Sequence, residues 1–136
     1  MNKLTPLERA VMDKLLEGED ISLAILRQQL EEAKVSERKM TGVGFYLTFV
    51  VPDNVRRLQG VLNVKFGDVH AEIPGLANGA GFLLYLRNGY LNMLEAYTYD
   101  EPWPQEIGKF ELSYDQGETR DLEKLLAVFR NSNTRE

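Results

Sequence analysis

Apolar residues in the first quarter of the chain recur every three or four positions, as they do along one face of a helix. They are Leu7, Val11, Leu15, Leu23, Leu26 and Leu30. Residues 5–8, Thr-Pro-Leu-Glu, are typical of a helix start, because the threonine caps the first amides and the glutamate completes a capping box. We predict two N-terminal helices, the second over 21–33, joined into a hairpin by residues 17–20.

From residue 43 onward the apolar spacing changes to every second position, which indicates strands. The expected strands cover 43–51, 64–73, 81–87, 90–99 and 109–114. The 64–73 run can split at Gly67-Asp68, which would raise the number of strands from five to six. A last helix is expected after Thr119 as its cap, followed by a frayed tail over 130–136.

Strands flanked by helices indicate an α+β fold. We expect an antiparallel sheet of about five strands, with the N-terminal hairpin and the C-terminal helix packed on one face. The chain of 136 residues contains neither a linker nor an internal repeat, so residues 1–136 are predicted to form a single domain.

Asn88-Gly89 is the clearest local signal in the chain. It joins two strand-like runs, and a type I′ turn suits it because both central residues need a positive φ. A regular hairpin about this turn places Glu95 opposite Phe82. The face predicted to pack on the helices carries Phe82, Leu84, Leu86, Leu91, Met93, Glu95 and Tyr97. Glu95 is thus predicted near the edge of the covered face.

Two interpretations of Glu95 follow from that position. A carboxylate among apolar groups needs a partner, so Glu95 can be a structural residue at the sheet rim that pairs with Lys or Arg or caps a loop amide. Without a partner, burial would raise the pKa of a carboxyl group, which is one route to a catalytic acid. The sequence leaves both interpretations open.

Residues 97–104, Tyr-Thr-Tyr-Asp-Glu-Pro-Trp-Pro, form the most distinctive segment. Rigid aromatic residues beside carboxylates can anchor a partner protein or stack on a ring-shaped ligand. The alternative is that Trp103 folds back over the open end of the core, with the prolines ending the strand. The candidate binding residues are Glu95, Tyr97, Tyr99, Asp100 and Trp103.

The residue types present exclude several kinds of site. The chain has no cysteine, and His70 is its only histidine, so a thiolate nucleophile, a histidine triad and a multi-histidine metal site are excluded. Asp68, His70 and Glu72 alternate along one strand face, where side chains project in parallel rather than converge, so we predict no metal. The glycines of 75–81 connect two strands, and no cofactor motif is present.

Net charge and hydropathy argue against two classes of binding partner, nucleic acid and membrane. A net charge of −5, with no basic cluster beyond Arg38-Lys39 and Arg56-Arg57, argues against nucleic acid. No window approaches the ~20 apolar residues of a membrane span, and the first residues lack the apolar core of a signal peptide. The absence of cysteine fits a reducing compartment, so we expect a cytoplasmic location.

Four segments together resemble a family of small bacterial proteins of unknown function. They are 41–45 (TGVGF), 67–75 (GDVHAEIPG), 79–82 (GAGF) and 94–104 (LEAYTYDEPWP). The resemblance extends over about residues 4–115 and implies an α+β fold and a bacterial, cytoplasmic setting. It implies no activity, so no functional residue is carried over. Ala96 departs from the family pattern, where glycine is more frequent.

Two functions compete on these observations. The favoured one is a non-enzymatic interaction module that presents residues 97–104 to a protein partner, comparable in class to bacterial immunity proteins. The alternative is a small-ligand-binding protein or enzyme that uses Glu95 as acid or base in a pocket walled by Tyr97, Tyr99 and Trp103. A flat aromatic patch would favour the first, and a concave pocket the second. A homodimer through an edge strand is compatible with either.

Overall fold

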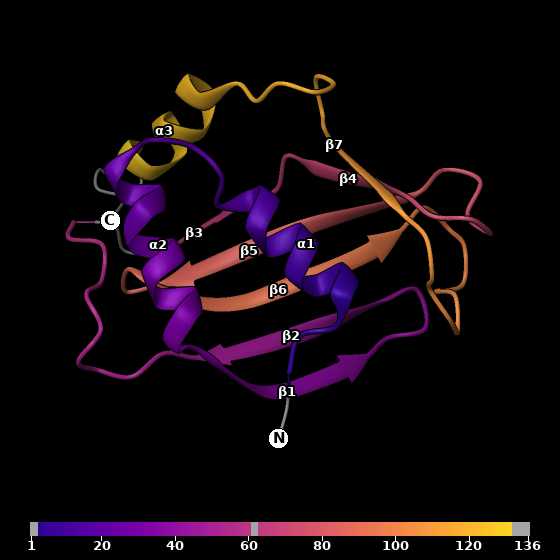
Figure 1. Cartoon of the computed structure of the whole chain (residues 1–136), viewed down its shortest axis with the longest axis horizontal. Coiled ribbons are helices and arrows are strands. Elements are labelled where there is room, and N and C mark those ends of the chain that lie inside the picture. The colour runs from indigo at the N-terminus through magenta and orange to yellow at the C-terminus, as the bar shows by residue number, and fades with distance from the viewer. Residues whose placement is uncertain (1–2, 61–62, 132–136) are drawn as a thin grey trace.

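Residues 3–60 and 63–131, which the computed structural model describes, form three helices and one antiparallel sheet of seven strands (Figure 1). The helices are α1 (Pro6–Leu15), α2 (Ile21–Glu32) and α3 (Leu122–Asn131). The strands are β1 (Lys34–Met40), β2 (Gly44–Val50), β3 (Asn63–Phe66), β4 (Val69–Glu72), β5 (Ala80–Arg87), β6 (Tyr90–Thr98) and β7 (Glu111–Tyr114). The predicted α+β class is confirmed, whereas the predicted number of strands is too low.

The strand that the hydrophobic pattern did not predict is β1. It lies at the edge of the sheet, and Val35 is its only buried residue. Alternation of apolar and polar residues marks strands that bury one face, so a polar edge strand lacks this signal. The other added strand arises at Gly67-Asp68, where the 64–73 run divides into β3 and β4.

The strand order is β1-β2-β6-β5-β4-β7, and β3 also pairs with β5. β3 pairs with the part of β5 that lies next to the Asn88-Gly89 turn, and β4 pairs with the opposite end. Figure 1 shows α1 and α2 crossing one face of this sheet, with α3 beside β3. Within the described ranges, the other face carries no helix.

Side-chain caps stand at the start of all three helices, and at α2 the Asp20 carboxylate accepts the Ser22 N–H at 2.8 Å. Thr5 Oγ1 accepts the Glu8 N–H at 3.2 Å, and the Glu8 carboxylate accepts the Thr5 N–H at 2.9 Å, which confirms the capping box. At α3, Asp121 rather than Thr119 has this role, because its carboxylate accepts the Lys124 N–H at 3.1 Å.

Two predictions about the helices need correction. α1 packs near β4 and α2 on β6, so the pair forms a layer over the sheet rather than a closed hairpin. Arg27 of α2 ties the connection between them by donating to the carbonyls of Leu16 (2.5 Å) and Gly18 (2.9 Å). Residues 130–131 of the predicted tail belong to α3, while 132–136 lie outside the described residues.

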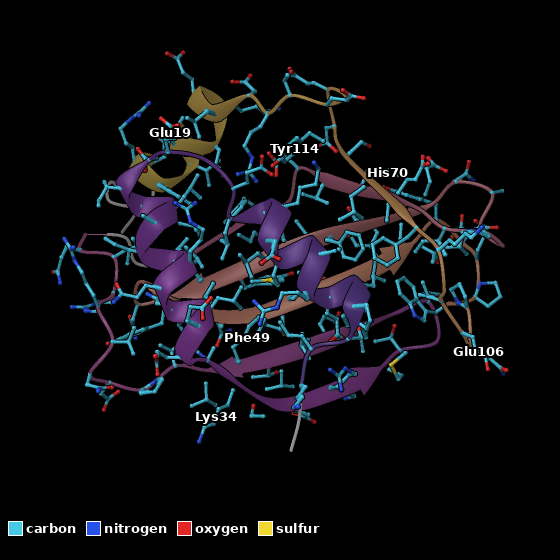
Figure 2. All side chains as sticks on the ribbon, in the orientation of Figure 1. Glu19, Lys34, Phe49, His70, Glu106 and Tyr114 are labelled. Atoms are coloured by element: carbon cyan, nitrogen blue, oxygen red, sulfur yellow. The ribbon has the colours of Figure 1, made fainter. Side chains whose placement is uncertain are left out.

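The core fills the space between the helices and the covered face of the sheet (Figure 2). Its large buried side chains include Met12, Leu15, Leu23, Leu26, Phe49, Phe82, Leu84 and Leu94. Phe66 of β3 and Phe129 of α3 meet edge to face, with ring centroids 5.5 Å apart, and so join the last helix to the sheet. Because side chains alternate along a strand, the residues between these core positions face away from the helices.

The tight turn between β5 and β6 is as predicted. Asn88 and Gly89 have φ values of 54° and 80°, both positive as a type I′ turn requires. Gln29 of α2, fully buried, donates to the Gly89 carbonyl at 2.9 Å and accepts the Leu91 N–H at 2.8 Å. The helix thereby holds the start of the hairpin.

The register of this hairpin changes after its first two residue pairs. Leu86 pairs with Leu91 near the turn, whereas Tyr85 pairs with Met93, so Asn92 is an extra residue in β6. This β-bulge shifts every later pairing by one position, and each side chain beyond it moves to the other face.

The predicted faces of β6 are therefore wrong beyond the bulge. Phe82 pairs with Ala96 and not with Glu95. The residues of β6 that turn toward the helices beyond the bulge are Leu94, Ala96 and Thr98. Those that turn to the uncovered face are Met93, Glu95 and Tyr97.

Candidate functional site

An aromatic patch with one carboxylate among its residues lies on the uncovered face of the sheet, and we call it the tyrosine face. Its residues, all half-buried, are Tyr46, Leu83, Tyr85, Met93, Glu95 and Tyr97. Tyr46, Glu95 and Leu83 lie side by side in one row across β2, β6 and β5. Met93 and Tyr85 are adjacent in the next row. Cross-strand neighbours are close enough for their side chains to interact, so these strands assemble one continuous surface.

Tyr85 orients the carboxylate of this surface. Its phenol O–H donates to Oε1 of Glu95 at 2.9 Å, and within the described residues no other hydrogen bond or ion pair reaches the Glu95 carboxylate. A carboxylate has about four lone-pair sites, so most of its accepting capacity is free. Glu95 thus has neither the position on the covered face nor the Lys or Arg partner that were considered for it.

The phenols of the tyrosine face are hydrogen-bond donors at neutral pH. Burial, followed by the hydrogen bond to Glu95, raises the pKa of Tyr85 to about 12. Burial and the neighbouring Tyr99 raise the pKa of Tyr97 to about 12. Both hydroxyl groups therefore keep their protons at neutral pH and can donate hydrogen bonds. The chemistry available here is hydroxyl donors beside a carboxylate acceptor.

Close packing places the ring of Tyr97 on the sheet. It lies over Gly81 of β5, where a side chain would collide with the ring. The Tyr97 ring also meets that of Tyr99 edge to face, with centroids 5.6 Å apart. Tyr99 is 46% exposed and extends the tyrosine face at the end of β6.

The turn that follows is held by its own polar groups. Asp100 is exposed and has a φ of 68°, so it occupies the turn position that reverses the chain. The Glu101 carboxylate accepts the N–H groups of Ala77 (3.0 Å) and Asn78 (3.3 Å), and Thr98 Oγ1 donates to the Glu101 carbonyl. Asp100 is left with its carboxylate in solvent beside Tyr99.

Trp103 lies away from the tyrosine face. Its ring meets that of Phe45 edge to face at 5.4 Å, and Phe45 is a core residue that faces the helices. The backbone N–H of Trp103 donates to the Gly42 carbonyl at 2.8 Å. This half-buried tryptophan therefore covers the end of the core, as the structural interpretation predicted.

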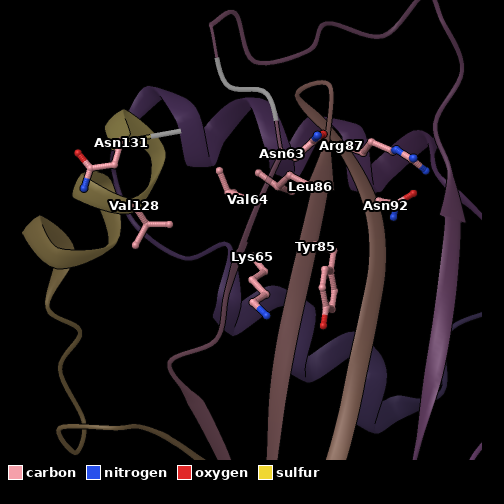
Figure 3. Close-up of a pocket in the computed structure, with 9 residues that line it drawn as sticks. All are labelled: Asn63, Val64, Lys65, Tyr85, Leu86, Arg87, Asn92, Val128 and Asn131. Carbon is pink, nitrogen blue, oxygen red and sulfur yellow. The ribbon is translucent and has the colours of Figure 1, made fainter. Parts of the chain in front are cut away.

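Two clefts of the described residues lie to the side of Glu95. One of about 610 Å³ opens between β3, β5 and α3, and Lys65, Tyr85 and Arg87 line it (Figure 3). Another of about 560 Å³ lies beside Trp103 on the helix side. Glu95 lines neither of them. Neither cleft is the pocket around Glu95, walled by Tyr97, Tyr99 and Trp103, that the alternative function requires.

The three alternating polar residues of 68–72 have separate partners. Asp68 accepts two hydrogen bonds from Arg120, at 2.8 and 2.9 Å, while His70 and Glu72 are paired at 3.0 Å. Within the described part of the chain, no three acidic, histidine or cysteine side chains are grouped to hold a metal ion.

Of the predicted site residues, the structure brings Glu95, Tyr97 and Tyr99 to one side, leaves Trp103 apart, and places Asp100 exposed in the turn after β6. Tyr46 and Tyr85 complete the surface and were not among the predicted residues. Alternation along β2 and β5 places both on the outer face, and this signal could have identified them.

No protein-family model, curated protein or solved structure matches this chain. The resemblance in the four segments described above stays a prediction. Among the described residues, no helix has the length and apolar character needed to cross a membrane.

Proposed function

We propose that this protein is a non-enzymatic binding module and that the tyrosine face, extended by Tyr99, binds a protein partner. The observation that carries the proposal is a sheet face over which the described residues place no helix, and on which tyrosine, leucine and methionine side chains surround the carboxylate of Glu95. Large amphipathic side chains of this kind dominate protein interfaces because they combine apolar contact area with hydroxyl groups.

Glu95 indicates the chemistry of the partner. Its carboxylate is held by Tyr85 and has free lone pairs in a half-buried position, where a charged hydrogen bond is stronger than in open water. A lysine or arginine of the partner would form an ion pair with the Glu95 carboxylate. The surrounding rings would pack on the apolar part of that side chain. A surface of this shape suits a partner side chain better than a small enclosed substrate.

The test is affinity capture from the source cells on immobilised protein, followed by NMR mapping of amide shifts with the captured partner. Glu95→Gln removes the charge with little change in shape, and we expect at least a tenfold loss of affinity. Glu123→Gln, an exposed change of the same kind on α3, is the matched control and should bind as the wild type does.

Shifts confined to β2, β5 and β6 would support the tyrosine face as the binding surface. Undiminished capture by Glu95→Gln together with shifts around Trp103 would contradict it. Turnover of a captured small molecule would instead favour the enzymatic alternative.

A further inference from the structure

The cleft between β3, β5 and α3 holds cations and hydrogen-bond donors that the tyrosine face does not use (Figure 3). Its volume of about 610 Å³ lies in the range of small-molecule sites. Two of its residues, Lys65 and Arg87, are cations, and none of the other described residues that line it is acidic. The whole chain, by contrast, has a net charge of −5. The cleft is therefore a positively charged site on an acidic protein.

The pairing of β3 with β5 places the two cations on one face of the sheet. Asn63 pairs with Arg87. Two residues further along β3, Lys65 pairs with Tyr85. These side chains face away from the helices, because Leu86, between Tyr85 and Arg87, is buried on the helix side. Lys65 and Arg87 are thus diagonal neighbours, which lie roughly 7–8 Å apart in a sheet, so two long side chains can contact one anion.

Neither cation is neutralised within residues 3–60 and 63–131. The side chains of Lys65 and Arg87 are exposed and take part in none of the ion pairs or hydrogen bonds there. The Lys65 ammonium lies 5.9 Å from the centroid of the Tyr85 ring, at the outer limit of a cation–π contact. The charge and the N–H groups of both residues therefore stay available to a ligand.

Two amides add neutral donors to this lining. Asn92, the residue that bulges from β6, lines the cleft, and its side chain has no hydrogen-bond partner in the described part of the chain. Bulges are frequent beside functional sites because the extra residue re-aims a side chain. Asn63 accepts the Asn88 N–H through Oδ1 at 3.3 Å, so its NH₂ group is left for a ligand. Cations together with amide N–H groups suit an oxyanion.

An apolar wall completes the cleft. Val64, Leu86 and Val128 line it together with the polar residues. Figure 3 shows Val128 of α3 facing Val64 of β3. An inorganic ion would leave this wall unused. The combination therefore fits an organic anion whose charged group contacts the strands and whose apolar part contacts α3.

We propose that this cleft binds a small phosphate monoester with an apolar body, and that its phosphate lies between Lys65 and Arg87. A phosphate monoester carries about two negative charges at pH 7, which match the two cations, whereas a carboxylate carries one. The proposal goes beyond the partner-binding function, because it uses the cations beside Tyr85 and not the Glu95 carboxylate.

Phenyl phosphate is the probe, and inorganic phosphate and phenol represent its two parts. Titration followed by NMR amide shifts gives each dissociation constant and maps the site. We expect phenyl phosphate to bind more tightly than either part, with shifts in β3, in α3 and in β5 near the Asn88-Gly89 turn. Equal affinity for phenol would overturn the proposal, since the anion would then contribute nothing. Equal affinity for inorganic phosphate would overturn it as well, since the apolar wall would then have no role.

Charge removal assigns the site to its residues. Lys65→Gln and Arg87→Gln should each weaken phenyl phosphate binding at least tenfold. Lys109→Gln, the same change at an exposed lysine before β7, is the matched control and should bind as the wild type does. All three positions are exposed, so far-ultraviolet circular dichroism should show the same fold in each variant. Wild-type affinity in both Lys65→Gln and Arg87→Gln would overturn the proposal.

Glu95→Gln separates this proposal from the proposed function. It removes a negative charge beside Tyr85, so phenyl phosphate should bind at least as tightly as it does to the wild type. Loss of phenyl phosphate binding in this variant would contradict the assignment to Lys65 and Arg87. The titration involves no partner protein, so its failure would leave the proposed function untouched.

Discussion

Glu8 of α1 and Glu95 of β6 are carboxylates on opposite sides of the sheet, and they differ in what surrounds them. Glu8 on the helix side is 2% exposed and accepts hydrogen bonds from the Thr5 N–H and from two nitrogens of Arg38. Glu95 on the open side is half-buried, and from the described part of the chain it accepts one hydrogen bond, from Tyr85.

This difference separates a structural acid from one available to a ligand. The bonds of Glu8 are made within the chain, so its charge is compensated and it joins the start of α1 to β1. Glu95 keeps most of its accepting capacity and is oriented by a phenol that does not neutralise it. A buried charge that is already paired serves the fold, whereas an oriented and unpaired one can serve binding.

The largest expected change in the free energy of unfolding comes from substituting two neighbouring residues of β5 that face opposite sides of the sheet. Phe82→Ala empties a fully buried site under the helices and should lower the free energy of unfolding by about 4 kcal/mol. Leu83→Ala on the tyrosine face removes a half-buried side chain and should cost about 1 kcal/mol. Urea denaturation followed by tryptophan fluorescence measures both. Equal losses would mean that the uncovered face is covered in solution.

The second prediction contrasts the two acids directly. Arg38→Met leaves Glu8 buried without its cation and should destabilise the fold by about 3 kcal/mol. Glu95→Gln should change stability by less than about 0.5 kcal/mol, because no cation among residues 3–60 and 63–131 pairs with that charge. Thermal unfolding at neutral pH compares the two variants. A large loss from Glu95→Gln would place Glu95 among the structural residues.

The smallest expected effect concerns the phenols. The pKa of Tyr85 and that of Tyr97 are raised to about 12 in the fold, above the ordinary value near 10. Their contribution to stability is therefore fully present below pH 10 and is lost as the pH rises through 12. The urea midpoint of the wild type should fall over this range, and that of Tyr85→Phe should fall less steeply. Parallel pH profiles would contradict the raised pKa of Tyr85.

Local signals predicted much of the fold. The capping box of Thr5 and Glu8 and the Asn88-Gly89 turn depend on contacts within a few residues, and both are present as expected. The α+β class followed from the order of helical and alternating segments. β1 was not predicted because an edge strand buries few residues and so lacks the apolar alternation. The predicted cap at Thr119 was wrong because Asp121 lies closer to the start of the helix.

The candidate site was predicted only in part. The sequence by itself determined its residue types and, through alternation, that Tyr97 and Tyr99 share a face with Glu95. The tertiary structure decided whether this shared face lies under the helices or on the uncovered side of the sheet. Asn92 bulges from β6, so the whole group turned from the helices to the open side.

Hydrophobic alternation defines two faces of a strand but does not say where an extra residue enters the ladder. That position depends on packing against other strands and on Gln29, which holds the hairpin from 60 residues away. The position of Trp103 likewise depends on a contact distant in sequence, because its ring packs on Phe45 and so lies away from Glu95. The sequence therefore determined which side chains share one face of a strand, and the packing of the sheet determined which of the two faces is exposed to solvent.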